Sequence, residues 1–311
     1  MDGIITEIMR FSLKDGPGIR TTVFLKGCNM ACKWCHNPET LSMRPQLMHY
    51  PELCIGCGAC IGVDYATGTS GAAVCPHGAI ESAGGAGGIA LHRERCVACG
   101  ACVDKCFSGA LVISGTKMSV ADVMTEILQD IDYYKNSGGG LTIGGGEPAC
   151  QSEFMLGLLK AAKEAGIQTA IETNMHADWD IYEKALPYLD LVMLDIKLSD
   201  DADHMKWTGT GNANLLANIR KITDIKPTII RVPVIPGVND NEAEIGKIAQ
   251  IAKDLKNIIS IELLLYNPLG ESKYAALGMD YSFRGQRPQG AGLAGSLQAA
   301  AQAAGVPVKI G

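Results

Sequence analysis

Cysteine is the residue type in this chain whose spacing points most directly to chemistry. Eleven of the 12 cysteines lie before residue 107. They form three groups, which are Cys28, Cys32 and Cys35; Cys54, Cys57, Cys60 and Cys75; and Cys96, Cys99, Cys102 and Cys106. A chain of 311 residues needs no disulfide framework, and a reducing cytosol disfavours one. We therefore expect the grouped thiolates to bind metal.

The second and third groups repeat one another. Residues 54–60 and 96–102 both have the spacing C-x2-C-x2-C, and each is followed by a more distant fourth cysteine. This arrangement is typical of two-cluster bacterial ferredoxins, in which the fourth cysteine ligates the other cluster. We therefore expect two [4Fe–4S] clusters. Crossed ligation gives Cys54, Cys57, Cys60 and Cys106 to one and Cys75, Cys96, Cys99 and Cys102 to the other. Structural zinc is the alternative, but it rarely uses three close thiolates and a distant fourth.

The first group differs because it supplies only three thiolates, at Cys28, Cys32 and Cys35. Three thiolates leave one iron of a four-iron cluster without a protein ligand, and an open position on a metal can bind a small molecule. The spacing therefore predicts a catalytic metal centre. On spacing alone, a zinc knuckle or three buried cysteines stay as alternatives.

The elements that must position these cysteines follow from the apolar pattern. After residue 107, β-branched runs alternate with helix-period segments, which is typical of parallel strands joined by crossover helices. The expected strands are Thr21–Leu25, Leu141–Ile143, Gln168–Glu172, Leu191–Ile196, Thr228–Ile235 and Ile259–Tyr266. About six β/α units result, fewer than the eight of a full TIM barrel. We therefore predict an α/β fold with a partial, open (β/α)6 TIM-like barrel.

One segment interrupts this pattern. Residues 53–113 contain close cysteines, many glycines and few long apolar runs. We expect an inserted ferredoxin-like domain there, with the barrel formed by residues 1–52 and 114–311. Within it, the 14 residues between Cys60 and Cys75 predict a surface loop, and the run from Ala83 to Gly88 a flexible connector.

Helix ends are indicated at several places. Ser119 is a suitable N-cap for a helix whose apolar residues recur from Val120 to Ile131. A second helix is expected to begin at Ser152 and to end at Gly166. The glycines from 285 to 295 predict a loop before a last alanine-rich helix.

Composition excludes several classes of partner. Lys and Arg number 27 against 33 Asp and Glu, so the net charge is −6, which disfavours binding to a nucleic-acid backbone. No apolar run approaches the roughly 20 residues that span a bilayer, and the first residues lack the pattern of a signal peptide. We expect a cytoplasmic protein of an anaerobe, with no nucleic-acid or membrane partner.

The first cysteine group resembles a known signature. The motif C-x3-C-x-aromatic-C, with Trp34 as the aromatic residue, is similar to that of the radical S-adenosylmethionine enzymes. Residues 15–21, DGPGIRT, and 34–39, WCHNPE, resemble the activating enzymes of glycyl radical enzymes, and the resemblance spans nearly the whole chain. The insert is similar to that of activators of glycerol or diol dehydratases, choline lyase, hydroxyphenylacetate decarboxylase, benzylsuccinate synthase and isethionate lyase.

The resemblance implies an activity. S-adenosylmethionine would chelate the open iron of the cluster at Cys28, Cys32 and Cys35, the catalytic cysteines, and one electron would cleave its sulfonium. The resulting 5′-deoxyadenosyl radical would abstract hydrogen from a glycine of a partner glycyl radical enzyme. The cofactors implied are three [4Fe–4S] clusters, S-adenosylmethionine and a monovalent cation. Electrons would come from a donor such as flavodoxin or ferredoxin.

The resemblance also implies contacts for individual residues, most of them at expected strand ends. The implied cofactor contacts are Trp34, His36, Gly144, Gly145, Gly146, Glu147, Glu172, Thr173, Met193, Asp195, Ile196, Lys197, Arg231 and Asn267. Among these, Glu172, Thr173, Met193 and Asp195 would surround the cation, although the pyruvate formate-lyase activator has aspartate in place of Glu172 and histidine in place of Asn267. Asp15 would bind the partner's peptide. The plain alternatives are a strand-end turn at residues 144–148, a surface lysine at 197 and a turn aspartate at 15.

Two other functions stay open at this point. One is a ferredoxin-type electron carrier, and the other is a radical S-adenosylmethionine enzyme that acts on a small molecule or another peptide. The last cysteine, Cys150, has no expected role and is expected to be a small buried side chain.

Overall fold

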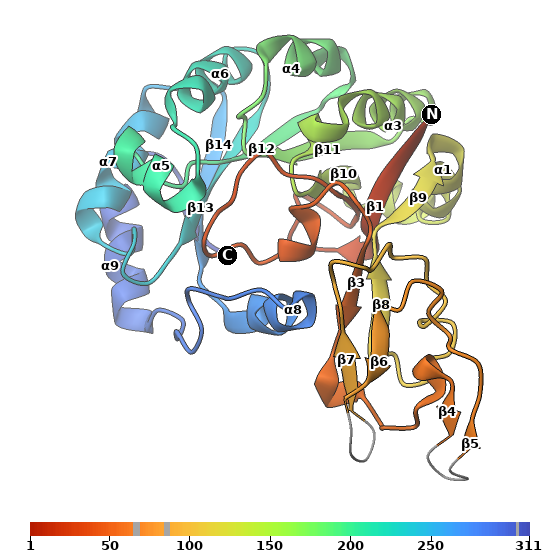
Figure 1. Ribbon diagram of the computed structural model, residues 1–311. Helices are drawn as coiled ribbons and strands as arrows, with labels where there is room; N and C mark the ends of the chain where they lie inside the picture. Colours follow the sequence, from red (N-terminus) through yellow and green to blue (C-terminus); the bar gives the residue numbers. More distant parts are fainter. Residues whose placement is uncertain (65–68, 84–87, 303–304) are drawn as a thin grey trace.

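A nine-stranded sheet forms the centre of the molecule in the computed structural model, which describes residues 1–64, 69–83, 88–302 and 305–311 (Figure 1). The order of its strands is β15-β14-β13-β12-β11-β10-β2-β1-β9. Their bounds are β1 Asp2–Ser12, β2 Arg20–Leu25, β9 Thr116–Ser119, β10 Gly140–Gly145, β11 Gln168–Thr173, β12 Leu191–Asp195, β13 Thr228–Val234, β14 Ile258–Leu265 and β15 Val308–Ile310. Because β9 and β15 stand at its two ends, the sheet is open.

The six expected strands are all present, and they pair in parallel as β2 and β10–β14. The prediction of a mixed α/β fold with a parallel sheet is therefore confirmed. Three strands of this sheet were not expected. The strands β1 and β9 pair antiparallel at one end of the sheet, and β15 adds a further parallel strand beside β14.

Most of the helices lie along the outer side of the curved sheet, whereas α8 lies beside β3 (Figure 1). Their bounds are α1 Val120–Leu128, α2 Ile131–Ser137, α3 Ser152–Glu164, α4 Trp179–Ala185, α5 Asp201–Thr208, α6 Ala213–Thr223, α7 Glu242–Lys253, α8 Glu271–Leu277 and α9 Ala291–Gln302. Between sheet and helices lies a core of fully buried apolar side chains, among them Leu141, Ile143 and Leu158. Burial of this layer is the main stabilising contribution to the sheet.

The expected helix ends are confirmed in part. The Ser119 side chain accepts a hydrogen bond from the Asp122 amide and forms a capping box, but α1 ends at Leu128, so Ile131 begins a separate helix. The helix α3 begins at Ser152, and Gly166 follows its end with φ +70°. The loop expected over residues 285–295 is wrong in its last five residues. The helix α9 already begins at 291, because Ala294, Leu297 and Ala301 bury one helical face.

Residues 46–114 form a smaller unit below the sheet (Figure 1). It contains three antiparallel pairs: β3 Gln46–His49 with β8 Leu111–Ser114, β4 Val63–Asp64 with β5 Thr69–Ser70, and β6 Ile80–Ser82 with β7 Ile89–Leu91. A small core of Leu47, Cys60, Ile80, Cys102 and Leu111 holds it together. The stretch between Cys60 and Cys75 thus contains a short strand pair. Its residues 65–68, and residues 84–87 of the expected connector, lie outside the described residues.

Candidate functional site

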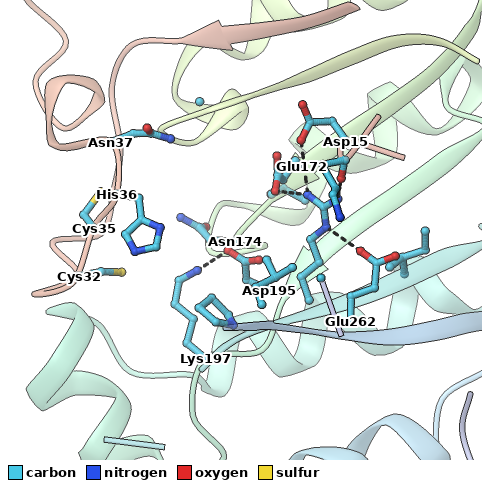
Figure 2. A pocket seen from close by; sticks show the side chains of 18 of the residues that line it. Asp15, Cys32, Cys35, His36, Asn37, Glu172, Asn174, Asp195, Lys197 and Glu262 are labelled. Atoms are coloured by element: carbon cyan, nitrogen blue, oxygen red, sulfur yellow. Dashed lines mark hydrogen bonds and ion pairs between the residues drawn. The ribbon is translucent and has the colours of Figure 1, made fainter. Parts of the chain in front are cut away.

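A cavity of about 710 Å³ opens at the carboxyl ends of the parallel strands (Figure 2). This volume is typical of a site for a small molecule or cofactor. The cavity brings together most of the residues expected to do chemistry, which are Asp15, Cys28, Cys32, Trp34, Cys35, His36, Gly145, Gly146, Glu172, Thr173, Asp195, Lys197, Arg231 and Asn267. Four expected residues, Gly144, Glu147, Met193 and Ile196, do not line it.

The three cysteines stand on the loop that follows β2. Backbone hydrogen bonds from Ala31 to the Thr208 carbonyl (2.8 Å) and from Lys33 to the Trp207 carbonyl (3.0 Å) fix this loop to α5. Burial raises the pKa of Cys28 and of Cys35 to about 12. Metal binding at these thiols would therefore have to displace their protons.

Two glycines of the turn after β10 permit close packing that a side chain would prevent. Gly145 has φ +116°, and a Cβ there would lie 2.3 Å from the Leu25 carbonyl oxygen. A Cβ on Gly146 would lie 2.2 Å from the Gly27 carbonyl oxygen. The turn can therefore lie against the cysteine loop, and it presents backbone rather than side chains to the cavity.

Glu147, the next residue, is completely buried and does not line the cavity. Its carboxylate accepts hydrogen bonds from the Ala149 amide (3.0 Å), the Thr173 hydroxyl (2.8 Å) and the Asn174 amide (2.7 Å). Burial raises its pKa to about 7. In this arrangement Glu147 joins the turn after β10 to the end of β11.

Three carboxylates, those of Asp15, Glu172 and Glu262, lie together at one side of the cavity (Figure 2). Arg231 joins them. Its guanidinium, only 4% exposed, forms an ion pair with Glu172, donates to Glu262 (3.2 Å) and lies 4.0 Å from Asp15. It also donates to the Lys14 carbonyl. Burial raises the pKa of Glu172, and the nearby Arg231 charge opposes that shift. The side chain of Arg231 is therefore fully engaged with the protein.

Asp195 and Lys197 form a second ion pair at the cavity wall. Burial alone would lower the pKa of Lys197, but the Asp195 carboxylate and the Cys32 thiol raise it above its ordinary value. Met193, on the same strand as Asp195, packs deeper in an apolar cluster with Ile229, and Ile196 belongs to the core between sheet and helices. Of the four residues implied as a cation site, Glu172 is thus paired with Arg231 and Asp195 with Lys197.

The aromatic side of the cavity holds Trp34 and His36. Trp34 is 4% exposed and packs against Trp207 and Phe283. The Nε2 atom of His36 is buried and has no hydrogen-bond partner among the described residues. Such an atom is available to a ligand in the cavity.

Asp15 and Asn267 stand at other points of the cavity lining. One oxygen of Asp15 accepts hydrogen bonds from the Ser12 and Thr22 hydroxyls, both at 2.7 Å. The Asn267 side chain accepts from the Leu269 amide at 3.2 Å and so caps the short turn before α8.

Asn174 and Glu262 are two polar residues of the cavity that were not anticipated from the sequence. Asn174 follows Thr173 at the end of β11, and its side-chain nitrogen Nδ2 lies 3.9 Å from the Cys28 sulfur. Glu262 is a charged residue within the otherwise apolar strand β14, and it pairs with Arg231. A lone acid inside an apolar strand was the available signal, because such a group needs a buried partner.

The remaining cysteines gather in the smaller unit. Cys75, Cys96, Cys99 and Cys102 line one small cavity. Cys60 has a pKa raised to about 11 by burial and by the neighbouring thiols of Cys106, Cys54 and Cys57. Within the described ranges, no three His, Cys, Asp or Glu side chains converge on a site for a single ion. Cys150 is exposed, so the expectation of a buried side chain there is wrong: it stands on the short turn after Pro148 rather than in the core.

Comparison with known proteins identifies the family. A model of the radical SAM superfamily matches residues 93–247, and a 4Fe-4S single cluster domain model matches residues 14–67. The chain is 39% identical to the (2S)-3-sulfopropanediol dehydratase activating enzyme of Klebsiella oxytoca, over 91% of this chain and 87% of that protein. It is 40% identical to the isethionate sulfite-lyase activating enzyme of Nitratidesulfovibrio vulgaris, over 88% and 86%. It is 38% identical to the benzylsuccinate synthase activating enzyme of Thauera aromatica, over 99% and 92%.

The chain belongs to the radical SAM activating enzymes of glycyl radical enzymes. The main interpretation of the sequence is thereby confirmed over the two alternatives, a ferredoxin-type carrier and an enzyme acting on a small molecule or other peptide. This activating enzyme uses an iron–sulfur cluster and S-adenosylmethionine, and its partner is a glycyl radical enzyme. None of the helices in the described residues is long and apolar enough to cross a bilayer.

Proposed function

We propose that this activating enzyme holds three [4Fe–4S] clusters. One is ligated by Cys28, Cys32 and Cys35, and the other two lie in residues 53–113, an inserted ferredoxin-like domain. Two observations support this number. A single cavity is lined by the four thiols of one crossed set, Cys75, Cys96, Cys99 and Cys102. In the other set, the thiols of Cys106, Cys54 and Cys57 lie close enough to Cys60 to raise its pKa.

The observation that carries the proposal is the large cavity with three thiols on one side. Its volume of about 710 Å³ leaves room for a cofactor beside a cluster, and three ligands leave the open iron that the cofactor needs. Bound there, the cluster and S-adenosylmethionine supply one-electron reductive cleavage of the sulfonium. The chain's own residues then have to hold the cofactor, exclude water and admit the partner's glycine.

The residues fit these tasks. The backbone of Gly145 and Gly146 can receive the cofactor's amino group, since no side chain stands in between. The ammonium group of Lys197 lies beside Asp195 and the thiol of Cys32, where it can attract the cofactor's carboxylate. The orphaned Nε2 of His36, with the buried indole of Trp34, can hold the adenine.

Arg231 and the buried Glu147 act in a different way in this proposal. Each is fully engaged with protein groups, so each positions other parts of the cavity wall. A monovalent cation at Glu172, Thr173, Met193 and Asp195 stays part of the proposal, and it would share the two carboxylates with Arg231 and Lys197.

The partner's glycine loop is proposed to enter from the side of Asp15, whose backbone and side chain border the cavity. The relatives that match at 38–40% identity activate enzymes with several different substrates. We therefore propose the partner only as a glycyl radical enzyme, with electrons supplied by a small donor such as flavodoxin or ferredoxin.

Iron content per chain tests the proposal. After anaerobic reconstitution, the wild type should bind about 12 iron atoms, three clusters of four. A variant with Cys28, Cys32 and Cys35 changed to alanine should bind about eight, and so should one with Cys75, Cys96, Cys99 and Cys102 changed to serine. The exposed cysteine variant Cys150→Ser is the control and should keep all the iron. Equal iron in all four proteins would contradict the proposal.

A further inference from the structure

The helix α8 lies between the three-cysteine site and the smaller unit of residues 46–114. At its start, a Cβ on Gly270 would lie 3.3 Å from the Cys35 carbonyl oxygen, and the Lys273 ammonium donates to the Asn37 side chain at 2.8 Å. At its end, Ala276 and Leu277 pack with Met48 of β3. A seven-residue helix is about 10 Å long, so one short helix separates the two regions.

Arg93 contacts the end of this helix from within the smaller unit. Its guanidinium donates to the Ala276 carbonyl (2.6 Å) and to the Leu47 carbonyl (2.8 Å). Gly278, with φ +68°, follows the helix, and a Cβ there would lie 2.7 Å from the Arg93 Nε atom. The backbone around α8 is thus shaped to receive this one side chain. A cation at the C-terminal carbonyls of a helix is also electrostatically favourable.

The same arginine is connected to one of the two thiol sets. The Cys96 amide donates to the Arg93 carbonyl (3.2 Å). The neighbouring His92 amide donates to the Ala79 carbonyl (2.8 Å), and the Ala79 amide lies 3.2 Å from the Cys75 sulfur. Leu47, whose carbonyl accepts from Arg93, lines the cavity of this thiol set. A single side chain therefore links the set of Cys75, Cys96, Cys99 and Cys102 to α8.

We propose that Arg93 is a positioning residue that holds this thiol set against α8, so that the cluster of this set delivers electrons to the three-cysteine site. The inference rests on the three clusters of the proposed function. Because the rate of electron transfer falls steeply with distance, a fixed contact at α8 sets the rate at which the site is refilled.

Successive equivalents of product measure this refilling. The reconstituted enzyme is reduced, freed of reductant and mixed with excess S-adenosylmethionine, and 5′-deoxyadenosine is followed by rapid quenching. Each cleavage uses one electron, so the wild type should form about three equivalents, one from each cluster. Arg93→Ala should form the first equivalent at the wild-type rate. Its later equivalents should form at least about tenfold more slowly. The reason is that this variant loses the two hydrogen bonds from a charged donor that hold the thiol set against α8.

Arg95→Ala is the matched control, because Arg95 is in the same loop but is exposed, and its side chain contacts Glu94 and the Gly78 carbonyl rather than α8. It should leave every equivalent unchanged. Later equivalents that form equally fast in Arg93→Ala and in the wild type would overturn the role of Arg93. Absence of the first equivalent in the wild type would instead overturn the proposed function.

A second readout needs neither clusters nor turnover. In the metal-free protein, Arg93→Ala should increase hydrogen exchange of the backbone amides in residues 46–49 and 271–278, whereas Arg95→Ala should not. Equal exchange in the two variants would show that Arg93 does not hold these segments together, and would also overturn the proposal.

Discussion

Replacing Arg231 with methionine removes a positive charge that three partly buried carboxylates share. Glu172 is ion-paired with it, Glu262 lies at 3.2 Å and Asp15 at 4.0 Å, and the three side chains are only 15% to 26% exposed. Removing one partner of a buried ion pair costs about 3–5 kcal/mol, because the remaining charge stays buried without compensation. We expect Arg231→Met to lower the free energy of unfolding by that amount.

Denaturant unfolding of the metal-free, reduced protein measures this loss. Lys184→Met is the control, since Lys184 pairs with Asp180 on the helix surface and both side chains are at least 60% exposed. Such a pair contributes at most about 0.5 kcal/mol. Adding Glu262→Gln to Arg231→Met should restore part of the stability, because one fewer carboxylate is left unpaired.

The loss should also depend on pH. The pKa of Glu172 is already raised by burial, and Arg231 opposes that shift. Without Arg231, the folded state holds the Glu172 proton to higher pH than the unfolded state does, so stability falls as pH rises. Arg231→Met should therefore lose more stability at pH 8 than at pH 5. A loss of less than about 1 kcal/mol, or no larger than that of Lys184→Met, would refute the reasoning.

Three further predictions concern the cavity wall and its entrance. The pKa of Glu147 is raised from 4.5 to about 7. As the pH rises between these two values, the wild type should therefore lose about 3 kcal/mol of stability relative to Glu147→Gln, with no further loss above them. A difference in stability between the two proteins that does not change with pH would contradict this. Gly146→Ala should cost about 1–3 kcal/mol and weaken S-adenosylmethionine binding in calorimetry, because its Cβ meets the Gly27 carbonyl at 2.2 Å. The matched change Gly246→Ala, on a helix with open space around it, should stabilise by up to about 1 kcal/mol, and similar effects at both glycines would exclude the packing explanation. Asp15→Asn should leave 5′-deoxyadenosine formation unchanged while reducing the glycyl radical signal of the partner in electron paramagnetic resonance; equal loss of both would exclude a role for Asp15 in binding the partner.

The sequence predicts the parallel part of the sheet well, since buried parallel strands read as continuous apolar runs such as residues 191–194. It does not predict β1 or β15. Only three of the 11 residues of β1 are buried, and β15 is three residues long, so both depend on pairing with a neighbour already in place. Whether a strand forms at the edge of a sheet is therefore decided by tertiary contacts rather than by the apolar pattern of its sequence.

The candidate site shows the same division. Cysteine spacing identifies the thiol groups because ligand number and spacing are local properties of the chain. The partners of Arg231 are not local: the register places it beside Asp195 on one strand and Glu262 on another, and only the fold reveals that it is fully paired. The orientation of Met193 and Ile196, one beneath the cavity and one in the core behind the sheet, also follows from where β12 ends.

Formation of 5′-deoxyadenosine from S-adenosylmethionine under a strong reductant tests the central claim most directly. The wild type should form it after anaerobic reconstitution. The variant with Cys28, Cys32 and Cys35 changed to alanine should form none, although the cysteines of residues 53–113 are intact and should still bind about eight iron atoms. Continued cleavage by that variant would contradict the claim that the three-cysteine cavity is the active site.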